Sequence, residues 1–89
     1  MTSDFEDGNA LAGALSEIFT VDVTAAKVRC VSCGHMCAVA NLHVYGPQPG
    51  SVARCPDCEA VLMRIVLTEH EAWLDVRGTT YLRVPLPTG

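Results

Sequence analysis

Two pairs of cysteines have the spacing of metal ligands. Cys30 and Cys33 form one C-x-x-C pair, Cys55 and Cys58 form the other, and residues 34–54 separate them. Two thiolates joined by a tight turn can point at one ion, and two such turns brought together by a hairpin give a tetrahedral four-sulfur site. Such a site suits Zn²⁺ and has no open coordination position. The spacing therefore predicts one Zn²⁺ per chain.

Other uses of these cysteines are less favoured. Iron in a rubredoxin-like site would be bound by the same four sulfurs, so the sequence distinguishes an iron site only weakly from a zinc site. Disulfides or a redox pair are disfavoured because a redox C-x-x-C normally opens a helix in a βαβ unit. Both pairs here lie between strand-like segments instead. Zinc is the preferred prediction.

The two pairs lie in similar local sequences. Arg29 and Arg54 come directly before them, and Gly34 follows the first pair where Glu59 follows the second. Glycine adopts the positive φ that commonly follows the second cysteine, so Glu59 is the weaker match and predicts a slightly strained turn. The arginines either offset the surplus negative charge of four thiolates around a divalent cation or simply face water. The sequence leaves both readings open.

Cys37 and the three histidines offer further chemistry. Cys37 could be an alternative ligand or a reactive thiol, but a small buried hydrophobic residue at the start of a strand is the favoured reading. His35 could replace Cys33 as a ligand, although the site does not need it. His35, His43 and His70 are expected to be ordinary surface or turn residues. With no base–nucleophile pair, we expect no enzymatic activity.

The elements that must position the cysteines are mostly β. Residues 1–8 are predicted to form an acidic tail. Residues 9–19 are predicted to form a short amphipathic helix capped by Asp7 or Asn9. The apolar face of this helix would consist of Leu11, Leu15, Ile18 and Phe19. A weak strand is predicted over 21–28, followed by strands over 38–45, 51–54, 60–67, 72–77 and 81–84, with turns at 46–50, 69–71 and 78–79.

Two patterns constrain how these strands pack. Over 38–45, Ala40, Leu42 and Val44 share one face. Residues 60–67 are nearly all apolar, which predicts burial on both faces of the strand. The helix is the spare apolar element that could cover the second face, either within the chain, which is favoured, or swapped onto a second copy.

The predicted fold class is a mostly β, small zinc ribbon. It would consist of antiparallel hairpins or a three-stranded sheet, with the N-terminal amphipathic helix packed on it. Residues 1–89 would form a single domain in which the ribbon spans 27–84. A chain of 89 residues with 49% hydrophobic and 18% charged residues has room for one small core.

Charge and hydropathy limit the partners. The formal net charge is −4, and no basic cluster of the kind that binds duplex nucleic acid occurs. No apolar run reaches the length of a membrane helix, and the acidic N-terminus does not resemble a secretory signal, so a cytoplasmic protein is expected. Whether the chain is a monomer or a homodimer stays open.

A protein partner is the favoured reading of the exposed faces. It would contact either the outward face of residues 43–45 or the stripe of Trp73, Asp75 and Arg77, although packing under the helix or a loop edge is preferred for Trp73. The alternative is a ribbon that binds nucleic acid, with Tyr45 stacking on a base. Its phosphate contacts would be Arg29, Arg54, Arg64 and Arg83.

Several segments together resemble a known family. The R-C-x-x-C units resemble a zinc ribbon, and residues 7–13, 21–25 and 73–78 make the chain similar over nearly its full length to small zinc-ribbon proteins of unknown function from high-GC bacteria. This resemblance implies a fold and a metal, but no reaction or substrate. The functional hypothesis is a non-enzymatic zinc ribbon that serves as a protein-interaction or accessory module. The alternatives are nucleic-acid binding and a thiol or redox role for Cys37.

Overall fold

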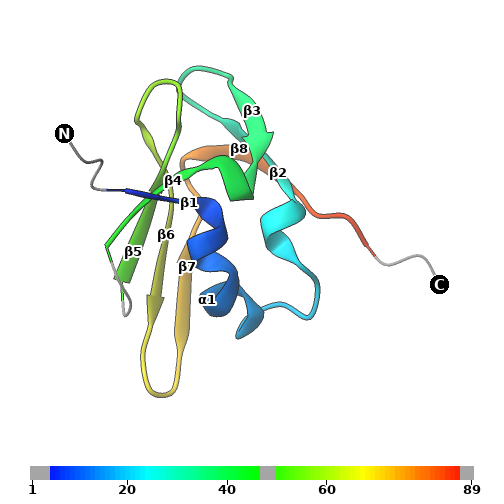
Figure 1. The fold of residues 1–89 in the computed structure, drawn as a ribbon, viewed down its shortest axis with the longest axis vertical. Helices are drawn as coiled ribbons and strands as arrows, with labels where there is room; N and C mark the ends of the chain where they lie inside the picture. The colour runs from blue at the N-terminus through cyan, green and yellow to red at the C-terminus, as the bar shows by residue number, and fades with distance from the viewer. Residues whose placement is uncertain (1–4, 47–49, 87–89) are drawn as a thin grey trace.

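The strands form two antiparallel sheets in the computed structural model, which describes residues 5–46 and 50–86 (Figure 1). The five-stranded sheet has the order β1 (Glu6–Asp7), β4 (His43–Tyr45), β5 (Gly50–Arg54), β6 (Val61–Leu67) and β7 (Ala72–Asp75). The three-stranded sheet has the order β3 (Met36–Ala38), β2 (Lys27–Cys30) and β8 (Thr79–Arg83). The mostly β fold class with a short N-terminal helix is confirmed. Of the turn predicted over 46–50, residues 47–49 lie outside the described residues.

The apolar run of β6 is explained by a bulge rather than by burial on two faces. Met63 pairs with Ala53 and Val61 with Arg54, so Leu62 is the extra residue between them. The bulge lets the consecutive side chains of Leu62 and Met63 both face the core, at 1% and 2% exposure. The prediction of two buried faces is wrong, because Arg64 and Val61 on the other face are exposed.

Trp73 on β7 lies on this same outer face. It pairs with Val66 and its side chain is 61% exposed, so the expectation that it packs under the helix or a loop edge is also wrong. The physical reason is the alternation of strand side chains: Leu74 faces the core side, and Trp73 must therefore face outward.

The N-terminal helical segment packs within its own chain. It consists of a 3-10 turn, η1 (Gly8–Leu11), followed by α1 (Ala12–Ser16), and is therefore shorter than the predicted helix over 9–19. Asp7 caps it as predicted, since its carboxylate accepts from the Asn9 N–H at 3.0 Å. Leu11 and Leu15 are buried in the same core as β5 and β6. So short a helix depends on this packing, because few residues and Gly13 make it marginal alone.

The predicted acidic tail is partly structured. Residues 1–4 lie outside the described residues, but β1 pairs with β4, with Glu6 opposite Val44. The Phe5 ring stacks on the His43 ring at 3.8 Å between centroids. The tail prediction is therefore wrong for residues 5–8, where an apolar ring and backbone pairing outweigh the acidic composition.

Two predicted strands are interrupted by helical turns. Residues 21–28 begin with η2 (Val23–Ala25), where the Asp22 carboxylate accepts from the Thr24 N–H at 3.1 Å, and only Lys27–Cys30 is strand. Residues 38–45 are split by η3 (Val39–Asn41), so that Val39 is buried, while Ala40 is only half-buried. The turn η3 carries the chain from the three-stranded sheet to the five-stranded sheet, which explains why the alternation is broken there.

The hydrophobic core includes the first cysteine of each pair. Cys30 is 1% exposed and Cys55 is 0% exposed, and both belong to the cluster formed by the two sheets and the helical turns. Within the described residues, no helix has the length and apolar character that a membrane span requires.

Candidate metal centre

All four predicted ligands converge on one point. The Sγ atoms of Cys30, Cys33, Cys55 and Cys58 lie within 4.8 Å of one another. They come from two turns, one after β2 and one after β5, that the fold brings together from opposite sheets. In each pair the first cysteine is buried and the second is exposed, so the cluster lies at the edge of the core.

Both turns have the same backbone pattern. In the first knuckle, residues 30–35, the Gly34 N–H donates to the Cys30 carbonyl at 2.9 Å, and the Cys30 N–H donates to the His35 carbonyl at 2.9 Å. In the second knuckle, residues 55–60, the matching bonds join Glu59 to Cys55 at 2.9 Å and Cys55 to Ala60 at 2.8 Å. The duplicated sequence therefore makes duplicated structure.

The sulfur separations fit a tetrahedron around one ion. Cys30 and Cys58 are 3.6 Å apart, and Cys33 and Cys55 are 3.7 Å apart, each pair joining the two knuckles. Four sulfurs at about 2.3 Å from a central zinc would lie roughly 3.8 Å from one another. A disulfide would need a separation of about 2.05 Å, and all five cysteines are free. The geometry is compatible with a metal site.

Backbone N–H groups point at the sulfurs, as metal-bound thiolates require. The Cys33 N–H lies 3.5 Å from the Cys30 Sγ, the His35 N–H lies 3.4 Å from the Cys33 Sγ, and the Asp57 N–H lies 3.4 Å from the Cys55 Sγ. Because an N–H donor favours the ionised sulfur, these contacts stabilise thiolates before any cation is considered.

Without a cation, however, the thiols of Cys30 and Cys33 do not both ionise near neutral pH. Burial raises the pKa of Cys30, but N–H groups of Cys33 and Ser32 and the thiol of Cys58 more than offset this and bring its pKa to about 7. For Cys33 the His35 N–H favours the thiolate, yet desolvation and the neighbouring thiols raise its pKa to about 12. A divalent cation removes this conflict, because its positive charge offsets the repulsion between neighbouring thiolates.

Glu59 is the position where the two knuckles differ. Its φ is +67°, matching the +81° of Gly34, so the strain predicted for a non-glycine residue there is present. Its carboxylate accepts from the Tyr45 hydroxyl at 3.1 Å and pairs with His43 Nδ1 at 3.0 Å. The second knuckle is thereby fastened to β4 by a side chain that the first knuckle does not have.

Both arginines lie against their knuckles. The Arg54 Nη1 donates to the Glu59 carbonyl at 2.8 Å. The Arg29 guanidinium lies 3.5 Å from where a Cβ on Gly34 would be. Each arginine therefore lies against its own knuckle, and Arg29 is at the same time exposed to solvent.

Cys37 and the histidines stay apart from the cluster. Cys37 lies on β3, half-buried against the core, where burial and then the nearby Cys55 raise its thiol pKa. His35 serves the first knuckle through its backbone, and His70 is exposed in the turn between β6 and β7. Within the described part of the chain, the four cysteines are the group of metal-ligating side chains that converges.

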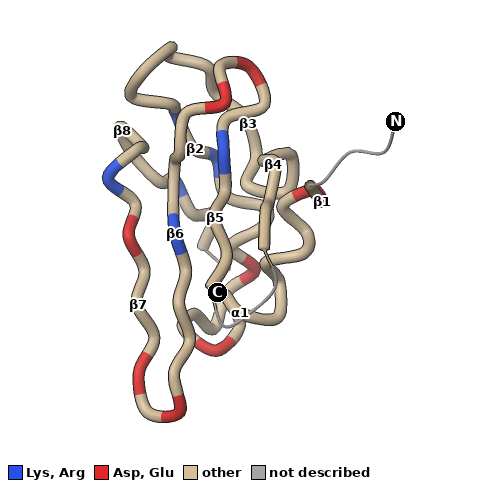
Figure 2. Tube along the Cα trace, turned by 90° about the vertical axis from the view of Figure 1, so that its left-hand side faces the viewer, with Lys and Arg blue, Asp and Glu red and all other residues tan. Residues whose placement is uncertain are grey.

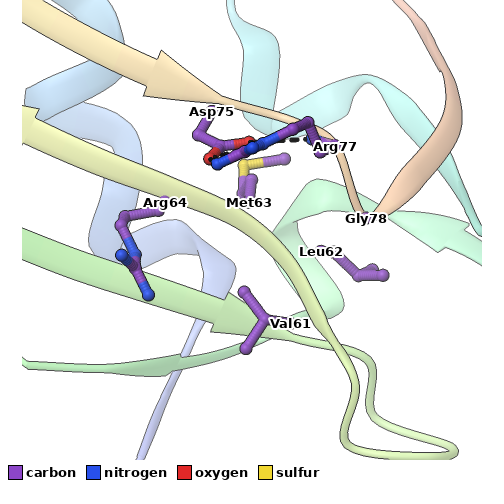
Figure 3. A pocket seen from close by; sticks show the side chains of 7 residues that line it. All are labelled: Val61, Leu62, Met63, Arg64, Asp75, Arg77 and Gly78. Carbon is purple, nitrogen blue, oxygen red and sulfur yellow. Dashed lines mark hydrogen bonds and ion pairs between the residues drawn. The ribbon is translucent and has the colours of Figure 1, made fainter.

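A hollow of about 230 Å³ lies between β6 and β7 (Figure 3). Arg77 and Asp75 face each other there, joined by bonds of 3.0 Å from Nε to the carboxylate and 2.6 Å from Nη2. Arg64 points away from this pair. The Asp75 carboxylate in this hollow is therefore held by the Arg77 guanidinium.

Two supports of the site are not predicted from the sequence. The link from Glu59 to His43 and Tyr45 could have been suspected from a charged residue at a glycine-like position. The second support is Gly78, whose N–H donates to the Leu62 carbonyl at 3.2 Å and whose carbonyl accepts from the Val31 N–H at 3.0 Å. A Cβ there would lie 1.9 Å from the Val61 carbonyl oxygen, so only glycine lets the first knuckle approach β6 this closely.

Comparison with known proteins identifies the family. The chain belongs to DUF6510, a family of unknown function, which it matches over residues 2–87. This agrees with the resemblance stated above to small proteins of unknown function. No curated protein and no solved structure matches the chain.

Proposed function

We propose that the protein is a non-enzymatic zinc ribbon, in which one structural Zn²⁺ is held by Cys30, Cys33, Cys55 and Cys58. The observation that carries this proposal is the set of four sulfurs within 4.8 Å of one another, contributed by two knuckles of equal backbone geometry. Zinc is preferred over iron because this donor set is that of structural zinc sites in ordinary small domains.

The zinc would stabilise the fold rather than take part in a reaction. Four sulfur ligands fill a tetrahedral site, so no position is left at which water or substrate could be activated. Binding of structural zinc supplies on the order of 10 kcal/mol or more in small domains, and this binding energy counts as folding energy. A chain whose short helix and small sheets bury a limited core needs such a contribution.

The remaining function would then be interaction with a partner. The outer face of the five-stranded sheet exposes Trp73 beside Val66, which supports contact with a protein. The thiol or redox alternative is less favoured because Cys37 is half-buried and its pKa is raised.

Elemental analysis combined with a thiol count tests the metal. We expect one zinc per purified chain, no iron, and a single thiol, that of Cys37, that reacts in the native protein. After chelation and denaturation all five thiols should react, and the near-UV circular dichroism should be lost. A protein without metal, or one in which all five thiols react while it stays folded, would contradict the proposal.

A further inference from the structure

The outer face of the three-stranded sheet carries three cations. Lys27 and Arg29 alternate with buried residues on β2, so both point outward, and Arg83 lies directly opposite Lys27 on β8. Like charges in opposite positions on neighbouring strands destabilise a sheet. Within residues 5–46 and 50–86, no carboxylate forms an ion pair with any of the three. This arrangement therefore costs stability that no ion pair among the described residues offsets.

An aromatic residue lies on the same face. Arg29 on the central strand pairs with Tyr81 on one side and with Met36 on the other. The Tyr81 hydroxyl donates to the Met36 Sδ at 2.7 Å. The outer strands of a three-stranded sheet are roughly 10 Å apart, because neighbouring strands are about 4.8 Å apart. The Tyr81 side chain therefore lies on the outer face, half-buried, and its hydroxyl meets the Met36 side chain from the other edge of the sheet.

The structure divides the nucleic-acid contacts considered in the sequence between two sheets. Arg54 and Arg64 belong to the five-stranded sheet, and the Arg54 guanidinium lies 5.7 Å from the centre of the Tyr45 ring. Arg29 and Arg83 lie on the other sheet, with Lys27 and Tyr81. Figure 2 shows that acidic residues occupy the turn between β6 and β7.

We infer that the outer face of the three-stranded sheet binds single-stranded nucleic acid, with a base stacked on Tyr81 and phosphates contacted by Lys27, Arg29 and Arg83. Proteins bind single strands without reading the sequence by combining cations with aromatic side chains on which bases stack. A duplex would need a longer basic footprint than a chain of net charge −4 provides. An acidic peptide would pair with the cations but would leave the ring unused.

This inference goes beyond the proposed function. It depends on that function only because the sheet must be folded, and folding is proposed to require the metal. It is tested with the zinc-loaded full chain and a fluorescein-labelled twelve-nucleotide oligothymidylate, followed by fluorescence anisotropy. We expect saturable binding. The logarithm of the association constant should fall with the logarithm of the salt concentration at a slope of about −2, because each of three phosphate contacts contributes about −0.7 for single strands. Binding that is absent even at low salt would overturn the inference.

Matched variants separate this face from general attraction. Tyr81→Leu should weaken binding at least fivefold, whereas Tyr81→Phe, which keeps the ring, should retain it within about twofold. Lys27→Gln combined with Arg83→Gln should reduce the slope to about −0.7. Trp73→Leu and Arg64→Gln make the same kinds of change on the five-stranded sheet and should leave binding unchanged.

Three results would overturn the inference while leaving the metal proposal intact. The first is equal weakening by Trp73→Leu or Arg64→Gln. The second is no effect of Tyr81→Leu. The third is competition by polyglutamate as effective as that by unlabelled oligothymidylate, which would assign the face to acidic peptides. Zinc content and thiol count, measured on every variant, show whether a loss of binding reflects loss of the fold instead.

Discussion

The two knuckles achieve the same geometry by different means. In the first, Gly34 adopts a φ of +81° without steric cost, and the backbone of Gly78 holds the turn against β6. In the second, Glu59 adopts a φ of +67° and its carboxylate contacts His43 and Tyr45 on β4. A metal-binding turn can therefore be stabilised either by backbone freedom or by a side chain that offsets the strain of the same conformation.

Ligand removal should affect both knuckles equally. We expect Cys30→Ser and Cys55→Ser each to abolish the cooperative fold, because each removes a buried ligand, and the zinc contribution to folding is on the order of 10 kcal/mol. Cys37→Ser, the matched control, should cost about 1 kcal/mol or less, since Cys37 is half-buried and outside the cluster. Zinc content and near-UV circular dichroism measure this. A folded, zinc-loaded Cys30→Ser variant would show that the knuckles do not share one ion.

The support of the first knuckle should be the next most sensitive point. Gly78→Ala places a Cβ 1.9 Å from the Val61 carbonyl oxygen, so the backbone must shift and the stability should fall by about 3 kcal/mol or more. Gly13→Ala is the control, because a Cβ there meets nothing within 4 Å, and alanine in a helix should stabilise by about 0.5–1 kcal/mol. Urea unfolding of the zinc-loaded protein measures both. Equal effects of the two substitutions would argue against this role of Gly78.

Exchanging the residues at the left-handed position should separate the two strategies. Gly34→Glu should cost about 1–2 kcal/mol, because a side chain with positive φ is strained. Glu59→Gly should change stability by less than about 1 kcal/mol, since relief of strain offsets the loss of two hydrogen bonds of about 0.5–1.5 kcal/mol each.

A double-mutant cycle sharpens this result. Tyr45→Phe should cost less in the Glu59→Gly background than in the wild type, because its hydroxyl has then lost the carboxylate that accepts from it. The denaturation midpoint at constant m-value measures these differences. Strict additivity of the two substitutions would mean that Glu59 does not fasten the second knuckle to β4.

The smallest effect should come from the ion pair next to Gly78. Hydrogen bonds from the Arg77 side chain and then from its N–H lower the pKa of Asp75 from 3.8 to about 2. A carboxyl whose pKa is lowered in the folded state stabilises above its unfolded pKa, so this contribution should be lost as pH falls from about 4 to 2. A carbon-13 carboxyl titration measures it, and Asp75→Asn should remove the dependence. The effect should be small, because Arg77 is exposed to solvent.

Local sequence was a good guide where a single turn decides the structure. The C-x-x-C spacing predicted four ligands that the structure brings together, and Asp7 caps the first helical turn as expected. It was a poor guide where one continuous pattern spans two elements. Residues 38–45 alternate like one strand, yet η3 interrupts them because the chain must leave one sheet for the other.

The sequence by itself determined the chemistry of the cluster, since cysteine spacing and turn residues depend on a few neighbouring backbone dihedrals. It also determined which segments are apolar enough to form the core. Only the tertiary structure decided that a bulge buries Leu62 and Met63 together and that Glu59 reaches β4. It also decided that Lys27 and Arg83 lie opposite each other without an ion pair to any carboxylate of the described residues. These are contacts between residues distant in the chain, and their register is set by how two sheets pack.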